Sequence, residues 1–226
     1  MIRIEQLSVA YGEKLVIKEL KAEFSNRQIY GVLGINGAGK TTLLNTIYGA
    51  KSAQEGQVTL MGKPITKQDI AYLQTENYFY PLMKGKEYLQ LVAPKQSYDS
   101  WNEIFRLPLE EFVENYSTGM KKKLAFLGLI LLNREVYILD EPFNGVDIQS
   151  NEILLLIIQS LKEKGKYIFI SSHMLTSLLQ VSDYIYRLQD GRFDQIVDRQ
   201  DFAQFKEDFQ VEISKEVTKK LKNLNF

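Results

Sequence analysis

The chain has 226 residues, 45% of them hydrophobic and 25% charged, which is typical of a globular protein with a substantial core. Its 28 basic and 28 acidic residues cancel, so no overall field favours nucleic acid or an anionic membrane. The absence of cysteine excludes disulfides and cysteine-type zinc sites and agrees with a reducing cytosol. The charged start and the short apolar runs 124–132 and 153–158 predict a soluble protein that reaches a membrane only through a partner.

The first 42 residues predict strands that lead into a phosphate-binding loop. Residues 1–33 alternate apolar and polar positions, with turn signals at 11–13 and 25–26, and end in the apolar strand 29–33. The next run, GINGAGKTT at 34–42, fits the pattern G-x-x-x-x-G-K-[ST]. Helical apolar spacing follows at 42–48, so a bound phosphate would lie at a helix N-terminus. This order argues against the alternative, a glycine-rich turn between two unrelated elements.

Each residue type in this loop has a chemical reason. Glycines let the backbone wrap closely around an anion, with successive N–H groups aimed at the phosphate oxygens. Lys40 places a positive charge on the β- and γ-phosphates, and the Thr41 hydroxyl can ligate Mg²⁺. The predicted ATP-binding residues of the loop are Gly34, Asn36, Gly37, Ala38, Gly39, Lys40, Thr41 and Thr42.

The remaining elements alternate between strands and helices. Strands are expected at 56–60, 70–73, 136–139 and 167–170, helices at 86–93, 101–105, 120–132 and 148–164, and a hairpin at 184–197 that turns at Asp190-Gly191. This pattern predicts an α/β fold: a P-loop NTPase core with a mainly parallel sheet, N-terminal antiparallel strands and an inserted, shortened helical lobe. We expect a single domain over 1–226, with a core at 1–74 and 133–197, the lobe at about 75–132 and a helical tail at about 198–226.

Two acids end the apolar strand that begins at Val136. At the carboxyl end of a parallel strand beside the phosphate loop, Asp140 is placed to hold Mg²⁺. Glu141 is then placed to orient and polarise the attacking water. The alternative is a pair of solvated acids at a strand end, which the phosphate loop upstream disfavours.

His173 is the only histidine and follows the apolar strand 167–170. A lone histidine is often a surface residue or a hydrogen-bonded core residue. Here the strand should lie beside the strand of Asp140, which favours a phosphate-sensing or water-positioning role.

Taken together, these residues resemble the nucleotide-binding subunit of an ATP-binding cassette (ABC) transporter over residues 2–196. The run Tyr116-Ser117-Thr118-Gly119-Met120-Lys121 is similar to the signature motif of that family, usually LSGGQ. In the family this motif caps the γ-phosphate of ATP bound to the opposite subunit. The resemblance therefore implies that Ser117 and Gly119 contact ATP in trans and that each site needs two chains.

The resemblance implies further roles. Tyr11 matches the aromatic residue that stacks on adenine, and Gln74 matches the glutamine that joins the two lobes and touches Mg²⁺ and water. Asp147, in Phe143-Asn144-Gly145-Val146-Asp147, matches the aspartate that couples the two sites across the dimer. His173 falls on the switch histidine of the family.

The chain departs from the family pattern at two signature positions and in the lobe. Thr118 replaces the first signature glycine, and Met120 replaces a glutamine whose amide it cannot imitate. The form YSxGM resembles the branch that serves bacterial drug, bacteriocin and antibiotic-resistance exporters. The lobe from Gln74 to Ser117 is short, and its aromatic run 78–82 is either a docking surface for a membrane subunit or a packed hinge.

The resemblance implies a Mg²⁺-dependent ATPase at the inner face of the cell membrane. Its partners would be a second nucleotide-binding subunit, identical or related, and a separate transmembrane permease. A non-transport ABC ATPase of DNA repair or translation is disfavoured because the chain has one compact cassette, no heptad run and no excess of basic charge. A regulatory cassette with little turnover stays open through Thr118 and Met120, although Asp140, Glu141 and His173 speak against it.

Overall fold

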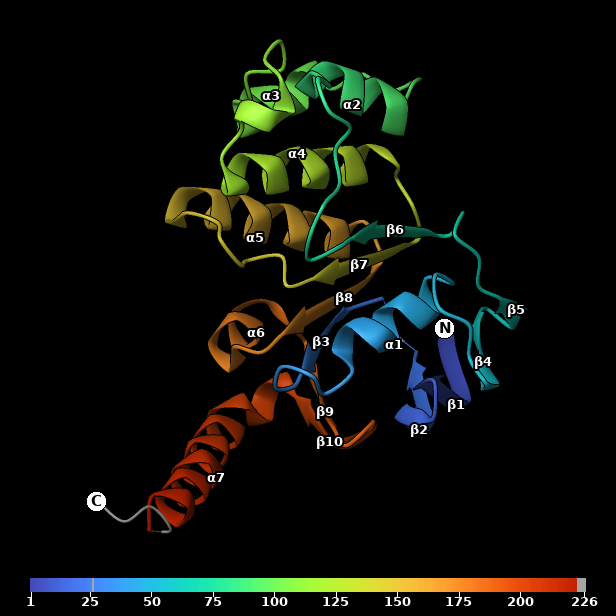
Figure 1. Cartoon of the computed structure of the whole chain (residues 1–226), viewed down its shortest axis with the longest axis vertical. Coiled ribbons are helices and arrows are strands. Elements are labelled where there is room, and N and C mark those ends of the chain that lie inside the picture. The colour runs from blue at the N-terminus through green and yellow to red at the C-terminus, as the bar shows by residue number, and fades with distance from the viewer. Residues whose placement is uncertain (26, 223–226) are drawn as a thin grey trace.

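The computed structural model describes residues 1–25 and 27–222, and it contains two β-sheets with helices around them (Figure 1). The smaller sheet is antiparallel, with the strand order β2-β1-β4-β5. Its strands are β1 (Ile2–Tyr11), β2 (Lys14–Phe24), β4 (Glu55–Leu60) and β5 (Lys63–Pro64). The predicted N-terminal antiparallel strands are confirmed. Of the predicted turn at 25–26, residue 26 lies outside the described residues.

The larger sheet carries the strands that end at the predicted phosphate site. Its order is β10-β9-β3-β8-β7-β6, and every neighbouring pair is parallel except β10 with β9. The strands are β3 (Ile29–Leu33), β6 (Ile70–Leu73), β7 (Val136–Asp140), β8 (Tyr167–Ser172), β9 (Tyr184–Gln189) and β10 (Arg192–Asp198). All residues of β3, β7 and β8 are buried, as expected of central strands covered on both faces. The predicted mainly parallel sheet is confirmed.

Helices cover both faces of this sheet. They are α1 (Lys40–Ile47), α2 (Gly85–Val92), α3 (Asp99–Phe105), α4 (Thr118–Leu131), α5 (Ile148–Glu163), α6 (Leu175–Val181) and α7 (Phe202–Lys222). Short 3-10 turns lie at Val113–Asn115 and Arg199–Asp201. The helix α6 has no counterpart in the sequence prediction, and of the predicted tail, residues 223–226 lie outside the described residues.

The apolar side chains form two cores, one on each face of the larger sheet. The first core lies between the two sheets and includes the buried face of α1, with Leu43 and Leu44. The second core lies under α2, α3, α4, α5 and α6 and receives the first turns of α7 through Phe202 and Phe205. The central strands are therefore fixed from both faces, and so are the loops at their carboxyl ends.

Phe24, at the end of β2, joins the smaller sheet to the larger one. Its ring centroid lies 4.8 Å from that of Tyr30 on β3, 4.8 Å from that of Phe169 on β8 and 5.0 Å from that of Tyr186 on β9. Aromatic rings at such separations attract each other beyond their burial. This cluster holds the two sheets together.

Over residues 1–25 and 27–222, no helix combines the length and the apolar character needed to cross a bilayer.

Replacing Phe24 with alanine should lower the free energy of unfolding by about 3–5 kcal/mol, because it leaves a cavity among three aromatic rings. Urea denaturation followed by circular dichroism measures this. The matched control is Phe112→Ala, since the Phe112 ring is 38% exposed. Equal losses in the two variants would contradict the role given to the Phe24 cluster.

Candidate functional site

The predicted phosphate loop connects β3 to α1 at the carboxyl edge of the larger sheet. Gly39, the residue before α1, has φ 104, a conformation that favours glycine. A Cβ at Gly34 would lie 2.8 Å from the carbonyl oxygen of Leu188, so a side chain there would collide with β9. The buried Lys40 donates from Nζ to the Gly34 carbonyl oxygen over 2.8 Å. The loop therefore folds around the Lys40 ammonium group.

Asp140 ends β7 and is buried beneath this loop. The Thr41 hydroxyl, in the first turn of α1, donates to Asp140 Oδ2 over 2.8 Å. The Ser171 hydroxyl on β8 donates to Asp140 Oδ1. These bonds satisfy both carboxylate oxygens, so the buried group is held in one orientation.

Glu141 directly follows Asp140 with φ 50, which is uncommon for a residue with a side chain. Its backbone N–H donates to Ser171 Oγ over 3.0 Å. Its carboxylate oxygen Oε1 accepts a bond from the His173 backbone N–H over 3.0 Å and lies 3.0 Å from His173 Nδ1. The same oxygen lies 3.5 Å from Lys40 Nζ. Lys40 from the phosphate loop and His173 from the loop after β8 therefore both lie next to the same oxygen of Glu141, Oε1.

A cavity of about 380 Å³ opens over this group of residues. Its lining comes from the phosphate loop, from β2 and from the loops after β6, β7 and β8: Val16, Asn36, Gly37, Gly39, Lys40, Thr41, Thr42, Thr75, Glu141, Asn144 and His173. A larger cavity of about 850 Å³ adjoins it on the other side of the loop and is lined in part by Tyr11, Gly34 and Ala38. The predicted phosphate-loop residues are therefore divided between two adjoining cavities.

Gln74 differs from the other predicted residues in its position. It follows β6 with an exposed side chain and lines neither of these two cavities. Its carbonyl oxygen accepts a bond from the Asn77 amide over 3.2 Å, and its neighbour Thr75 lines the smaller cavity.

The residues of the signature-like run form a second group with Asp147. Ser117 caps α4, because its hydroxyl accepts a bond from the Met120 N–H over 3.2 Å. Asp147 caps α5 through the backbone N–H and the hydroxyl of Ser150, which hold the pKa of the carboxyl below its ordinary value. A Cβ at Gly119 would lie 3.4 Å from the Gly145 carbonyl oxygen and 4.0 Å from Asp147 Oδ2.

This second group lies apart from the phosphate cavity of its own chain, since Ser117, Gly119 and Asp147 do not line it. The starts of α1, α4 and α5 nevertheless lie on the same side of the molecule, on the left in Figure 1. The elements that carry the phosphate loop and the signature-like run therefore begin on the same side of the molecule, with α4 and α5 above α1 in Figure 1.

Lys122 connects the two groups, and the sequence analysis gave it no role. Its side chain is buried, and Nζ donates to the backbone carbonyl oxygens of Glu141 and Asn144, each over 2.8 Å. Burial lowers the pKa of this lysine, and the carboxylates of Glu141 and Asp140 oppose that effect. The signal in the sequence was a run of three lysines on an apolar helix, because helical periodicity must turn one of them inward.

Comparison with known proteins assigns the chain to a family. Residues 17–144, more than half of its length, match the family described as ABC transporter. The chain belongs to the ABC transporter family. It is an ATP-binding subunit with the ATPase cassette of that family, and the nucleotide binding expected from the phosphate loop is confirmed.

Two relatives illustrate the similarity within this family. The chain is 32% identical over 206 residues to the uncharacterized ABC transporter ATP-binding protein YhaQ of Bacillus subtilis, covering 85% of this chain and 69% of that protein. It is 33% identical over 207 residues to the bacitracin transport ATP-binding protein BcrA of Enterococcus faecalis, covering 84% of this chain and 67% of that protein.

Solved structures agree on the fold. A structure described as the ATP-binding subunit of an ABC transporter is 26% identical, with a TM-score of 0.84 over 95% of this chain and 99% of that chain. The dimeric structure of the bacterial ABC transporter cassette MJ0796 has a TM-score of 0.80 over 88% of this chain and 99% of that chain, at 18% identity. This second similarity concerns the fold alone.

Replacing Lys122 with methionine should lower kcat for ATP hydrolysis by roughly tenfold or more, with a smaller effect on the Kd for ATP. The loop that carries Glu141 loses two backbone anchors, and small displacements of a catalytic group cost large factors in rate. Steady-state ATPase assays and nucleotide titration separate the two effects.

The control for this variant is Lys121→Met at the half-buried neighbouring position. Lys122→Arg keeps donors for the two carbonyl oxygens and should recover part of the lost rate. Equal kcat values for Lys121→Met and Lys122→Met would contradict the positioning role.

Proposed function

We propose that the chain is the Mg²⁺-dependent, ATP-hydrolysing subunit of an exporter and drives a separate transmembrane permease. The observation that carries the hydrolytic role is the position of Glu141. Its carboxylate projects over the phosphate cavity, next to His173 Nδ1 and Lys40 Nζ, at 3.0 Å and 3.5 Å. An acid held beside a phosphate-binding lysine is suited to act on a water molecule at the γ-phosphate.

The residues present fit Mg²⁺. Thr41 Oγ1 and the Asp140 carboxylate offer hard oxygen ligands 2.8 Å apart. Nowhere in the described chain do three or more His, Cys, Asp or Glu side chains gather as a self-sufficient metal site. That suits an ion held by one or two side chains together with substrate phosphates. Thr41 and Asp140 would hold it, and when bound it would neutralise phosphate charge. Gln74, whose exposed side chain lines neither cavity, would join them only by turning inward.

The roles of the side chains follow from their positions. Lys40 binds the β- and γ-phosphates through its ammonium group. Glu141 accepts a proton from the attacking water as the new oxygen–phosphorus bond forms and the bond to the ADP oxygen breaks. His173 holds the Glu141 carboxylate through its backbone N–H and its ring, which keeps that acid aimed into the cavity.

We further propose that two chains close head to tail around two ATP molecules. Ser117 and Gly119 do not line the phosphate cavity of their own chain, and the start of α4, which they form, lies on the same side of the molecule as the start of α1 (Figure 1). In such a dimer they would meet the γ-phosphate bound to the partner at the start of α4, where the helix dipole favours an anion. Asp147 would then lie at the junction of the chains. ATP would favour closure because it adds contacts available only in the closed dimer.

The transport role is supported by the relative BcrA, whose name describes bacitracin transport. The direction of export is proposed from the YSxGM form of the signature-like run. For the permease contact, the aromatic run after β6 offers exposed side chains at Tyr78, Tyr80 and Leu82. Phe79 instead packs inward, with its ring centroid 4.9 Å from that of Tyr88. The exposed side chains of this run support a docking surface, and the inward-facing Phe79 supports a packed hinge, so both interpretations of the run are supported. The permease would hold the subunit at the inner face of the cell membrane.

Replacing Glu141 with glutamine should preserve ATP binding and lower turnover by about 100-fold or more, because the amide cannot accept the proton. The variant should also accumulate as an ATP-bound dimer, which size-exclusion chromatography with MgATP detects. Wild-type rates of hydrolysis in this variant would remove Glu141 from the catalytic role.

Replacing Lys40 with alanine should weaken binding of ATP roughly 10- to 100-fold, because the phosphates lose a charge-assisted hydrogen bond. Isothermal titration calorimetry measures the loss. Arg192→Ala is the control, since Arg192 is exposed and pairs with Glu19 on the surface. Unchanged affinity in the Lys40 variant would rule out the phosphate-loop assignment.

A further inference from the structure

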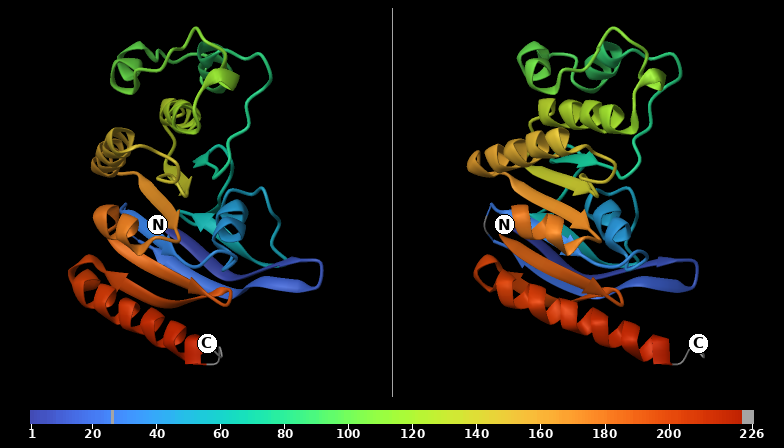
Figure 2. Two further views of the ribbon diagram at one scale, coloured as in Figure 1. Left: turned by 60° about the vertical axis from the view of Figure 1, so that its left-hand side comes forward. Right: turned by 90° about the vertical axis from the view of Figure 1, so that its left-hand side faces the viewer.

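The C-terminal helix α7 runs beside β9 and β10 and continues past the phosphate loop (Figure 2). Its first turns enter the core of the larger sheet through the buried Phe202 and Phe205, and Phe209 packs at the edge of that core. Because a helix turns once in 3.6 residues, Phe205, Phe209 and Ile213 lie along one face. This face continues from the core towards the phosphate loop.

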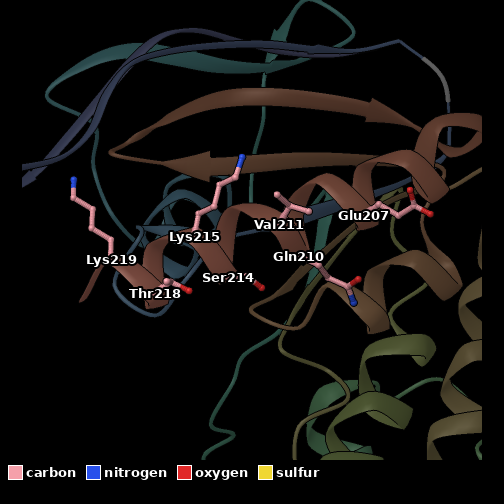
Figure 3. Close-up of a pocket in the computed structure, with 7 residues that line it drawn as sticks. All are labelled: Glu207, Gln210, Val211, Ser214, Lys215, Thr218 and Lys219. Atoms are coloured by element: carbon pink, nitrogen blue, oxygen red, sulfur yellow. The ribbon is translucent and has the colours of Figure 1, made fainter. Parts of the chain in front are cut away.

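The opposite face of α7 is a different surface. It carries a shallow groove lined by this helix alone, with side chains that are mostly polar: Glu207, Gln210, Val211, Ser214, Lys215, Thr218 and Lys219 (Figure 3). Val211 is 50% exposed there, and Ile213 on the other face is 46% exposed. Among the exposed aliphatic side chains of the helix, Val211 and Ile213 thus have similar exposure in different surroundings.

The face with Ile213 forms one wall of the larger cavity beside the phosphate loop. That cavity has a volume of about 850 Å³ and draws its lining from the ends of β1 and β9, from β2, from the loop 34–38 and from α7. The helix contributes Phe209, Glu212 and Ile213. Tyr11 lies in the same lining, and Lys51 Nζ, 4.2 Å from the centre of its ring, holds that ring by a cation–π contact.

An ion pair fixes the middle of α7 against the sheet. Arg187 on β9 donates from Nη1 to Glu212 over 2.6 Å. The same guanidinium group binds Asp194 on β10 through Nε and Nη2, over 2.9 and 2.5 Å. A guanidinium that bridges two carboxylates leaves the helix little freedom to rotate. The side chains of α7 that line the cavity are therefore held in place.

The chemistry of this cavity suits a nucleobase with its ribose. It adjoins the phosphate cavity, because Val16, Asn36 and Gly37 line both. Besides Tyr11 it has aliphatic walls from Leu15 and Ile213, and apolar walls with a few polar groups are typical of small-molecule sites. A nucleotide whose phosphates bind at Lys40 could place its base here without leaving the loop.

We propose that α7 forms the outer wall of the nucleotide site, with Ile213 and Phe209 in apolar contact with the base or ribose of ATP. The proposal rests on phosphate binding at the loop and extends the site to a helix near the C-terminal end of the chain. It gives α7 a selective role, because the helix would contribute to the affinity for a nucleoside triphosphate and not to that for the phosphates alone.

The test compares MgATP with inorganic triphosphate, which has the phosphates but no base. Both are titrated calorimetrically into the full chain carrying Ile213→Ser or, as the matched control, Val211→Ser. The Ile213 variant should bind ATP roughly three- to tenfold more weakly and triphosphate unchanged. The Val211 variant should bind both as the wild type does.

Two results would overturn the proposal: an unchanged ratio of ATP to triphosphate affinity in the Ile213 variant, or an equal change in the control. Arg187→Gln supplies a second test, since releasing Glu212 should weaken ATP binding and spare triphosphate binding. The Lys40→Ala variant tests phosphate binding independently of α7. If Lys40→Ala leaves both affinities unchanged, the loop assignment fails, whatever α7 does.

Discussion

The buried carboxylate of Asp140 is the constraint on which the rest of this site depends. A carboxylate is costly to bury unless its oxygens are hydrogen-bonded, and here α1 and β8 each provide a hydroxyl through Thr41 and Ser171. These two hydrogen bonds thereby fix the positions of the phosphate loop, β7 and β8 relative to one another. Ser171 also binds the backbone of Glu141, so the same arrangement sets the direction of the next acid. Loop, acid and histidine meet because one buried charge on β7 requires partners from two other elements, α1 and β8.

Much of this arrangement could be predicted from the sequence. The phosphate loop, the strand ending in Asp140 and Glu141, and the histidine after the next strand are local patterns whose residue types carry their own chemistry. The alternation of apolar strands with helices predicted the parallel sheet, and parallel strands bring their carboxyl ends to one edge.

The parts that escaped prediction depend on contacts distant in sequence. Lys122 is one of three adjacent lysines, and only the packing of α4 against the Glu141 loop selects it. The C-terminal segment was expected to be a charged helix, and α7 is one. Its proximity to Tyr11 and the phosphate loop follows from the β9–β10 hairpin and from Arg187, which no periodicity reveals. The helix α6 was missed because it is short and follows directly on β8.

The central claim is that one chain holds the phosphates while a second chain completes the site through Ser117 and Gly119. The chain has no cysteine, so introduced thiols give an unambiguous readout. Chains carrying Ala38→Cys and chains carrying Thr118→Cys, each also with Glu141→Gln, are mixed and oxidised with or without MgATP. A disulfide between unlike chains should form only with MgATP. A disulfide that forms equally with and without MgATP, or the absence of any disulfide between unlike chains, would contradict the head-to-tail dimer.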